Sequence, residues 1–217
     1  MKRLVPPYEK HYRFREVSKH VTKKNARLLD VGCGDATLPL YLDDTIKYFG
    51  IDVNPKSNQA KKIDITKDKF PFKSDFFDYV VCTEVLEHID NHQNCLSEVR
   101  RVLKPNGILV GTVPNCLAFP RIISFSDASL EEGKRYAVGE NHIVAFGFPE
   151  IRDLLRTNKF KVLEQYYFYF IFSNRIPLSI PILDKLLKKF CFYIFFKAKK
   201  NYFEETTEVF EVATDEG

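Results

Sequence analysis

The chain has 217 residues, a net charge of +4 and 45% hydrophobic residues, which suits one α/β domain with an insertion and is short for two full domains. Its five cysteines are scattered without a Cys-x-x-Cys pair, so we expect neither disulfides nor a zinc knuckle. No long apolar run precedes the first expected strand, and the aromatic stretches 166–172 and 190–196 are far shorter than the roughly 20 residues that span a bilayer. We therefore expect a cytoplasmic protein without a signal peptide or a transmembrane segment.

The charges are distributed unevenly along the chain. Residues 1–27 hold nine Lys and Arg against two Glu, and residues 204–217 hold six acidic residues and no basic one. A basic arm can meet nucleic acid or an anionic membrane, but a solvated helix face is the simpler interpretation, so we expect no nucleic-acid partner. The acidic tail is expected to be disordered.

The first expected element is a helix over 8–21, which places Phe14, Val17 and Val21 on one apolar stripe. The basic residues of this segment point mostly away from that stripe. We expect the helix, within an N-terminal segment 1–25, to flank the site described next.

A strand over 27–31 is expected to lead into a glycine loop and then into a helix over 36–42. Glycine at 32 and 34 lets the backbone turn sharply and approach a ligand closely. Thr37 stands where a dinucleotide site needs its third glycine, and Asp30 would repel a pyrophosphate. A carboxylate there suits a ligand that carries an ammonium and a sulfonium, such as S-adenosylmethionine. The alternative is an ordinary strand-to-helix turn.

The second expected strand, 46–52, ends in Asp52, twenty residues after Gly32. This spacing places the carboxylate at the tip of a neighbouring parallel strand, where it can accept both ribose hydroxyl protons. The alternative is a surface Asp that opens a turn. A short third strand is expected over 63–65, where Asp64 either meets an adenine amino group or caps the loop.

Further strands are expected over 78–82 and 108–113, with a helix between them whose apolar face includes Cys95 and Val99. Alternation of strands and helices predicts a parallel sheet, in which ligands bind beyond the carboxyl ends of the strands. Pro149 is expected to open a helix that is followed by a strand over 160–172. The last strand, 190–196, is expected to pair with it in an antiparallel direction.

These pieces together resemble the class I S-adenosylmethionine-dependent methyltransferases, and more narrowly the ubiquinone and menaquinone biosynthesis branch. The resemblance rests on Leu-Leu-Asp-Val-Gly-Cys-Gly at 28–34, Gly-Ile-Asp at 50–52, Glu-Val-Leu-Glu-His at 84–88 and Leu-Lys-Pro-Asn-Gly at 103–107, with Asp64 and the Phe-Pro-Phe…Phe-Asp stretch at 70–78 between them. It implies a seven-stranded Rossmann-like α/β sheet, mostly parallel with an antiparallel last strand and helices on both faces. Residues 1–203 would form this single methyltransferase domain.

The resemblance also implies roles for individual residues. Asp30 and the 32–34 backbone would hold the methionine end of S-adenosylmethionine, Asp52 the ribose, and Asp64 with Ile65 the adenine. The full set of expected cofactor-binding residues is Asp30, Gly32, Cys33, Gly34, Asp52, Val53, Asp64, Ile65, Thr83 and Glu84. The family usually has a third loop glycine where this chain has Ala36, whose extra methyl would shift the cofactor slightly.

His142 and His88 are the candidate bases, needed only if the acceptor is a hydroxyl. Each has an alternative: His88 as a helix-start residue bonded to backbone, and His142 as an exposed loop residue. In the ubiquinone branch the Glu84-Glu87-His88 pattern is associated with a divalent metal, but residues at these spacings do not automatically converge on one ion, so no metal is expected.

Residues 115–148 are long for a connection and rich in aromatics, so we expect them to form a lid over the acceptor. The expected activity is methyl transfer to a small, lipophilic molecule at oxygen or nitrogen. A tRNA or protein acceptor, and a non-catalytic partner subunit that binds the cofactor, are the alternatives. A basic amphipathic stretch at 182–189 either touches a membrane surface or covers the core. The oligomeric state is not predicted.

Overall fold

The computed structural model describes residues 9–117, 143–168 and 191–200, with side chains from residue 12 onward. In this part of the chain seven strands form one sheet in the order β3-β2-β1-β4-β5-β7-β6. The strands are β1 (Arg27–Val31), β2 (Lys47–Asp52), β3 (Ala60–Lys62), β4 (Phe77–Thr83), β5 (Leu103–Pro114), β6 (Phe160–Phe168) and β7 (Tyr193–Lys200). The helices are α1 (Glu9–Ser18), α2 (His92–Val102) and α4 (Phe148–Thr157), with 3-10 helices η1 (Leu38–Tyr41) and η2 (Leu86–His88).

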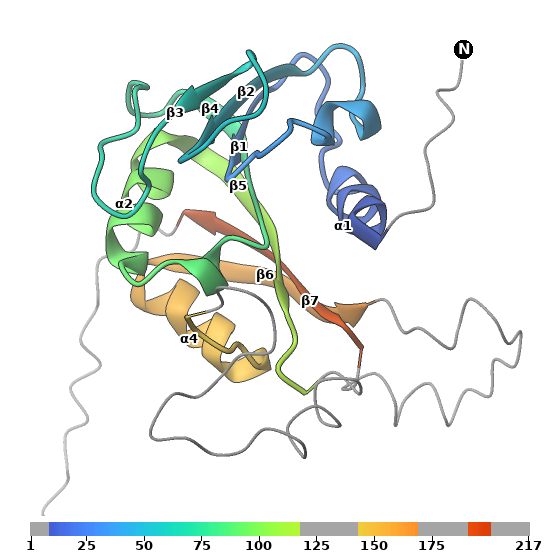
Figure 1. The fold of residues 1–217 in the computed structure, drawn as a ribbon, viewed down its shortest axis with the longest axis vertical. Helices are drawn as coiled ribbons and strands as arrows, with labels where there is room; N and C mark the ends of the chain where they lie inside the picture. Colours follow the sequence, from blue (N-terminus) through green and yellow to red (C-terminus); the bar gives the residue numbers. More distant parts are fainter. Residues whose placement is uncertain (1–8, 118–142, 169–190, 201–217) are drawn as a thin grey trace, which may run out of the picture.

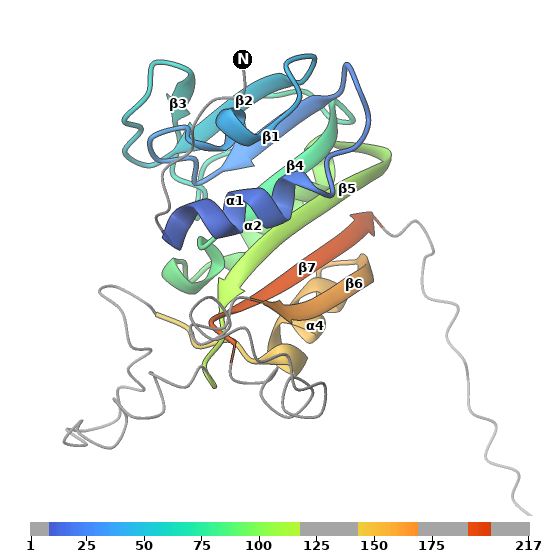
Figure 2. The same ribbon diagram turned by 90° about the vertical axis from the view of Figure 1, so that its right-hand side faces the viewer.

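Strand direction follows the predicted pattern. Strands β3, β2, β1, β4 and β5 pair in parallel, whereas β7 runs antiparallel to both β5 and β6. Figure 2 shows β7 inserted between β5 and β6, with α1 crossing the sheet. The expected mostly parallel sheet with an antiparallel last strand is confirmed.

Helices cover the two faces of the sheet (Figure 1). One hydrophobic core lies between α1 and the sheet, and it contains Phe14 and Val17 of α1 and Phe195 of β7. The other core packs α2 and α4 against the opposite face through side chains such as Val99 and Ile151. The predicted apolar stripes of these helices are therefore the buried ones, and none of the described helices is long and apolar enough to cross a membrane.

The ligand position follows from the strand order. Strand β1 lies between β2 and β4, so the chain leaves β1 toward one edge of the sheet and later returns on its other side. Folds of this kind bind their ligands at such a reversal, between the loops that follow the two strands, and this expected binding region is called the crevice below. The glycine loop after β1 and residues 83–84 at the end of β4 flank this crevice.

Two predicted elements are wrong in kind or position. The helix expected over 36–42 is only η1, one 3-10 turn, because the backbone is already extended at Leu42. The strand expected over 63–65 is β3, three residues earlier, because the side chain of Asp64 accepts hydrogen bonds from Thr66 and closes a turn there.

Other boundaries differ by a few residues. Strand β5 begins at Leu103 instead of residue 108, and its pairing with β4 is irregular near Asn106, which has a φ of 63°. Strand β7 covers 193–200 instead of 190–196, because its pairing with β6 extends to Lys200. The core of the expected lid, the 182–189 stretch and the acidic tail lie outside the described residues.

Candidate functional site

The glycine loop is closed on one side and open on the other. The N–H groups of Gly32 and Cys33 donate to the carbonyl oxygen of Ile51 at 2.8 and 3.1 Å, which ties the loop to β2. Both glycines have left-handed backbones, with φ of 71° at Gly32 and 53° at Gly34. A Cβ on Gly32 would lie 2.3 Å from Cγ2 of Val85, whereas a Cβ on Gly34 would meet nothing within 4 Å. Open space therefore lies over Gly34, as a close-fitting ligand requires.

Asp52 brings the end of β2 into contact with this loop. Its Oδ2 accepts the N–H of Gly34 at 2.9 Å, and its Oδ1 accepts the N–H of Asn54 at 2.7 Å. A carboxylate offers about four acceptor positions, so it can still accept two hydroxyl protons. Val53 follows with 60% of its surface exposed, an apolar side chain beside the carboxylate. The structure thus joins two features that the sequence predicted separately.

Asp30 lies beneath the loop and is only 2% exposed. Its Oδ2 accepts the hydroxyl of Tyr48 at 2.9 Å. Burial raises the pKa of Asp30 to about 7, and the Asp52 carboxylate adds to this shift, while the Tyr48 hydrogen bond opposes it. Burial also raises the pKa of Cys33 to about 12, so that this thiol stays protonated and is not a nucleophile.

Asp64 and Ile65 lie in the turn after β3, at the same edge of the sheet as Asp52. The carboxylate of Asp64 accepts the Thr66 N–H and hydroxyl and lies 2.8 Å from Nζ of Lys67. The Lys67 and Thr66 hydrogen bonds lower the pKa of Asp64 to about 2. This geometry is that of the loop-capping alternative, while Ile65 is buried in the core on the α2 side.

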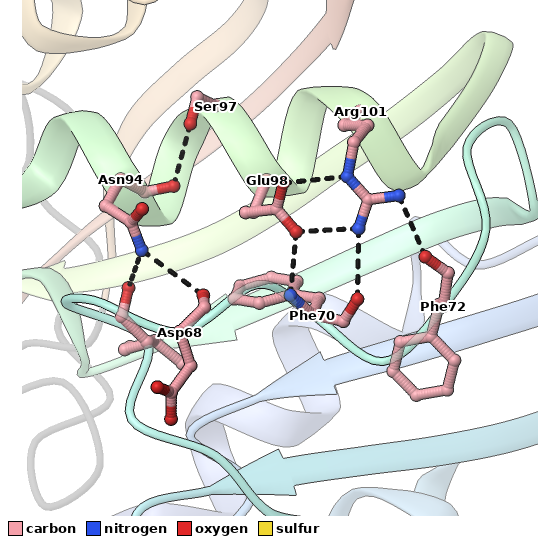
Figure 3. Close-up of polar contacts among 8 residues, drawn as sticks. Asp68, Phe70, Phe72, Asn94, Ser97, Glu98 and Arg101 are labelled. Carbon is pink, nitrogen blue, oxygen red and sulfur yellow. Dashed lines mark hydrogen bonds and ion pairs between the residues drawn. The ribbon is translucent and has the colours of Figure 1, made fainter.

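Side chains of α2 hold the next part of this loop (Figure 3). Glu98 Oε2 accepts the N–H of Phe70 at 2.7 Å, and Arg101 donates to the carbonyl oxygens of Phe70 and Phe72 at 3.0 and 2.8 Å. Arg101 also donates to both oxygens of Glu98. Asn94 bonds the carbonyl oxygen of Ile65 at 2.9 Å. These hydrogen bonds hold residues 65–72, which lack regular secondary structure, against α2.

The end of β4 forms the other wall of the crevice. Thr83 is its last, buried residue, and Glu84 follows with a left-handed φ of 54°. Oε1 of Glu84 accepts the hydroxyl of Thr112 at 3.0 Å, and Oε2 lies 3.1 Å from Nη1 of Arg13 on α1. Glu84 is thus fixed by one partner on the neighbouring strand and one on the N-terminal helix.

The candidate bases are placed only in part. His88 is the last residue of η2, and its side chain is 39% exposed. Its Nε2 lies 3.9 Å from Oε1 of the buried Glu87 carboxylate. His142 lies outside the described residues. Within the described ranges no group of three His, Cys, Asp or Glu side chains could hold a metal ion.

The ends of the 115–148 insert are anchored beside η2. Asn115 and Phe146 form a β-bridge, and Cys116 N–H donates to the carbonyl oxygen of Phe146 at 2.9 Å. The N–H groups of Ile143 and Val144 donate to the carbonyl oxygen of Glu87 at 2.7 and 3.1 Å. The insert therefore leaves and rejoins the domain beside η2.

Sequence reasoning missed Arg13, Thr112 and Tyr48. Arg13 was counted among the basic residues that face away from the apolar stripe, Thr112 was part of an apolar strand, and Tyr48 was part of another. Their neighbours in sequence carry no signal for these contacts, which join distant segments.

Comparison with known proteins agrees with this geometry. A family profile described as a methyltransferase domain matches residues 9–165, which include the loop, Asp52 and the end of β4. The chain belongs to this family. It is an S-adenosylmethionine-dependent methyltransferase domain whose cofactor is S-adenosylmethionine, and the open cradle over Gly34 with the Asp52 carboxylate beside it fits that cofactor.

Three curated relatives illustrate the similarity. An uncharacterised protein of Methanocaldococcus jannaschii is 37% identical over 47% of this chain and 48% of its own length. A second uncharacterised protein of that organism is 29% identical over 91% of this chain and 88% of its own length. The demethylmenaquinone methyltransferase of Bacillus pumilus is 26% identical over 49% of this chain and 53% of its own length. The chain thus spans about half the length of the first and third of these relatives.

Solved structures share the fold. The S-adenosylmethionine-dependent methyltransferase of Archaeoglobus fulgidus superposes with a TM-score of 0.62 and 17% identity, over 86% of this chain and 92% of its own. The predicted family and the predicted Rossmann-like architecture are confirmed.

Proposed function

We propose that this methyltransferase transfers the methyl group of S-adenosylmethionine to a small, lipophilic acceptor at an oxygen or nitrogen atom. The observation that carries the proposal is the apolar character of the edge where the insert begins and ends. Leu117 and Ile143 are 45% and 59% exposed there. Nearby, the rings of Phe168 and Tyr193, at the ends of β6 and β7, lie 5.4 Å apart. Exposed apolar side chains beside a cofactor site favour an apolar ligand.

Ion pairs of three basic residues in the N-terminal segment support a small acceptor over tRNA. Lys19 pairs with Glu16 at 2.6 Å, and Lys23 pairs with Asp78 at 2.6 Å. Arg13 pairs with Glu84 at the site itself. Charges that are matched by acids of the same domain contribute less to phosphate binding than unmatched ones.

The cofactor, when bound, supplies a methyl group already activated by its sulfonium. The chain itself has to bind the cofactor, orient the acceptor and exclude water. We assign binding to the 32–34 backbone, Asp52 and Val53, with Glu84 at the end of β4 and Asp64 in the turn after β3. The buried residues Asp30, Thr83 and Ile65 are assigned a supporting role behind these positions. His88 and His142 remain the proposed bases for a hydroxyl acceptor.

Calorimetry with S-adenosylmethionine tests the cofactor side. The wild type should bind, and Asp52→Asn should weaken binding by roughly tenfold or more, since hydrogen bonds to a charged group contribute about 1.5–3 kcal/mol. Asp44→Asn is the matched control, because it makes the same substitution at an exposed loop carboxylate. Undiminished binding by Asp52→Asn would contradict the assignment.

Radiolabelled cofactor identifies the acceptor class. The protein is incubated separately with a lipid extract, a tRNA pool and a protein extract, and label is expected only in organic-soluble products. Label in RNA or protein would favour those alternatives. Cofactor binding without label in any pool would favour a non-catalytic partner subunit.

A further inference from the structure

Three aromatic rings on the α2 side of the sheet are only partly covered by the rest of the domain. They belong to Phe49 of β2 and to Phe72 and Phe76, which precede β4, and all three pack on the edge of the core. The rings of Phe72 and Phe76 are parallel, with centres 6.5 Å apart. Phe49 meets both of them edge-on, at 5.8 and 5.7 Å. The rings thus form one continuous apolar surface.

Three cations surround these rings. The guanidinium carbon of Arg27 lies 4.4 Å from the ring centre of Phe76, and Nζ of Lys73 lies 5.7 Å from the same centre. Nζ of Lys61 lies 5.3 Å from the ring centre of Phe72. Within the described ranges none of these cations forms an ion pair with a carboxylate. We call the three rings and these three cations the aromatic-basic patch.

The acidic side chains closest to the patch are already paired with other cations. Asp78 lies 2.6 Å from Nζ of Lys23 and 2.8 Å from Nζ of Lys104. Asp75 lies 2.8 Å from Nζ of Lys200. The positive charge of the aromatic-basic patch is therefore not balanced by these neighbours, and a surface of this kind attracts anionic groups.

The chain leaves the last strand beside the patch. Lys200, the last residue of β7, donates to Oδ1 of Asp75, the residue directly before Phe76. Figure 2 shows the arrowhead of β7 at the edge of the sheet where β1, β4 and β5 begin. Glu204, the first residue of the acidic tail, follows four positions after Lys200. Four extended residues span at most about 14 Å, so the tail begins within reach of the patch.

The composition of the acidic tail complements the patch in charge and in apolar character. Residues 204–217 hold six acidic residues and no basic one, with Val209, Phe210 and Val212 among them. A single exposed ion pair is weak. A tethered segment, however, acts at an effective concentration in the mM range, so that a few weak pairs keep it bound at low ionic strength.

We propose that the acidic tail docks on the aromatic-basic patch of its own domain, with its carboxylates on the cations and its apolar side chains on the rings. The docked tail covers a positive surface and so keeps external polyanions from it. This interaction does not depend on the nature of the methyl acceptor.

Zero-length cross-linking of the full chain with a carbodiimide tests the docking, because it joins only carboxylates and amines that are in contact. At about 20 mM salt, mass spectrometry of the monomer band should find Lys61 and Lys73 linked to glutamates of the tail. At about 1 M salt, where charges are screened beyond about 3 Å, these links should disappear. Lys56, an exposed residue in the loop after β2, is the control and should form no link to the tail.

Two cross-linking results would overturn the inference. Tail links to Lys159 or Lys161 in place of Lys61 and Lys73 would assign the tail to the start of β6, where Lys161 is the register partner of Lys199. Links found only in a dimer band would assign the tail to a second copy of the chain.

Proteolysis gives an independent measurement on the same full chain. A glutamate-specific protease should cleave the tail roughly threefold faster or more in Lys61→Gln/Lys73→Gln than in the wild type, because the undocked tail is more accessible. Lys56→Gln/Lys62→Gln removes the same charge from exposed positions outside the patch and should cleave at the wild-type rate. Equal cleavage rates in all three proteins would show that the tail is not held at the patch.

Discussion

Gly32→Ala is the substitution with the most definite structural consequence. Gly32 has a φ of 71°, and an added Cβ would lie 2.3 Å from Cγ2 of Val85, which is itself only 7% exposed. A left-handed backbone costs a non-glycine residue about 1–2 kcal/mol, and overpacking at a buried contact adds about 1–3 kcal/mol. Alanine also restricts the unfolded chain more than glycine does, which adds about 0.5–1 kcal/mol to the free energy of unfolding. The free energy of unfolding should therefore fall by about 2–4 kcal/mol.

Gly34→Ala is the matched comparison. Its φ of 53° carries a similar backbone cost, but its Cβ meets nothing within 4 Å, so its stability should fall by only about 1 kcal/mol. Because that Cβ occupies the open space of the cradle, Gly34→Ala should nevertheless weaken cofactor binding. Urea unfolding gives the stabilities, and calorimetry gives the affinities.

Val85→Ala separates the clash from the backbone strain. Removing Cγ2 makes room for the new Cβ, so the Gly32→Ala/Val85→Ala double variant should be more stable than the sum of the single effects predicts, by about 1–2 kcal/mol. The effects of Gly34→Ala and Val85→Ala on the free energy of unfolding should be additive. Equal stability of the two glycine variants, or additivity in both pairs, would refute the reasoning.

Three further substitutions follow from backbone strain and buried charge. Ala36→Gly should raise the free energy of unfolding by about 0.5–1 kcal/mol, since Ala36 has a φ of 53°; a lower Tm would contradict this. Burial holds the pKa of Asp30 at about 7, above its usual 3.8, so the folded state keeps a proton that the unfolded state releases and stability falls as pH rises from about 4 to 7. Asp30→Asn should remove this fall in the free energy of unfolding, which is roughly 4 kcal/mol between pH 4 and 7 and is measured by urea titrations at several pH values. An unchanged pH dependence in the variant would count against this account. At Asp78 burial opposes ionisation, but the Arg27 N–H and Lys104 hold the pKa at about 2, so its contribution is present above about pH 4 and is lost as pH falls toward 2. Asp78→Asn should cost about 1–2 kcal/mol at pH 7 and little at pH 2, and an equal cost at both pH values would argue against the ion-pair account.

Local sequence signals predicted most of the fold. Apolar runs that end in Asp52 or Thr83 identified strands and their carboxyl ends, and the stripe through Val17 identified the buried face of α1. These signals depend on neighbours in sequence, where periodicity and turn chemistry act. The helix over 36–42 was overestimated for the same reason, because local apolar spacing did not reveal that the backbone becomes extended at Leu42.

The sequence by itself determined the family, the parallel sheet and the glycine loop with Asp52, since each is encoded by residues close together or by the spacing between such groups. Only the tertiary structure decided that Tyr48 covers the Asp30 carboxylate and that Arg13 reaches Glu84. Ion pairs and buried hydrogen bonds form wherever packing brings two polar groups together out of water, and that packing is a property of the assembled sheet and its helices. Glu84 at the end of β4 therefore pairs with a residue that local sequence assigns to a helix surface.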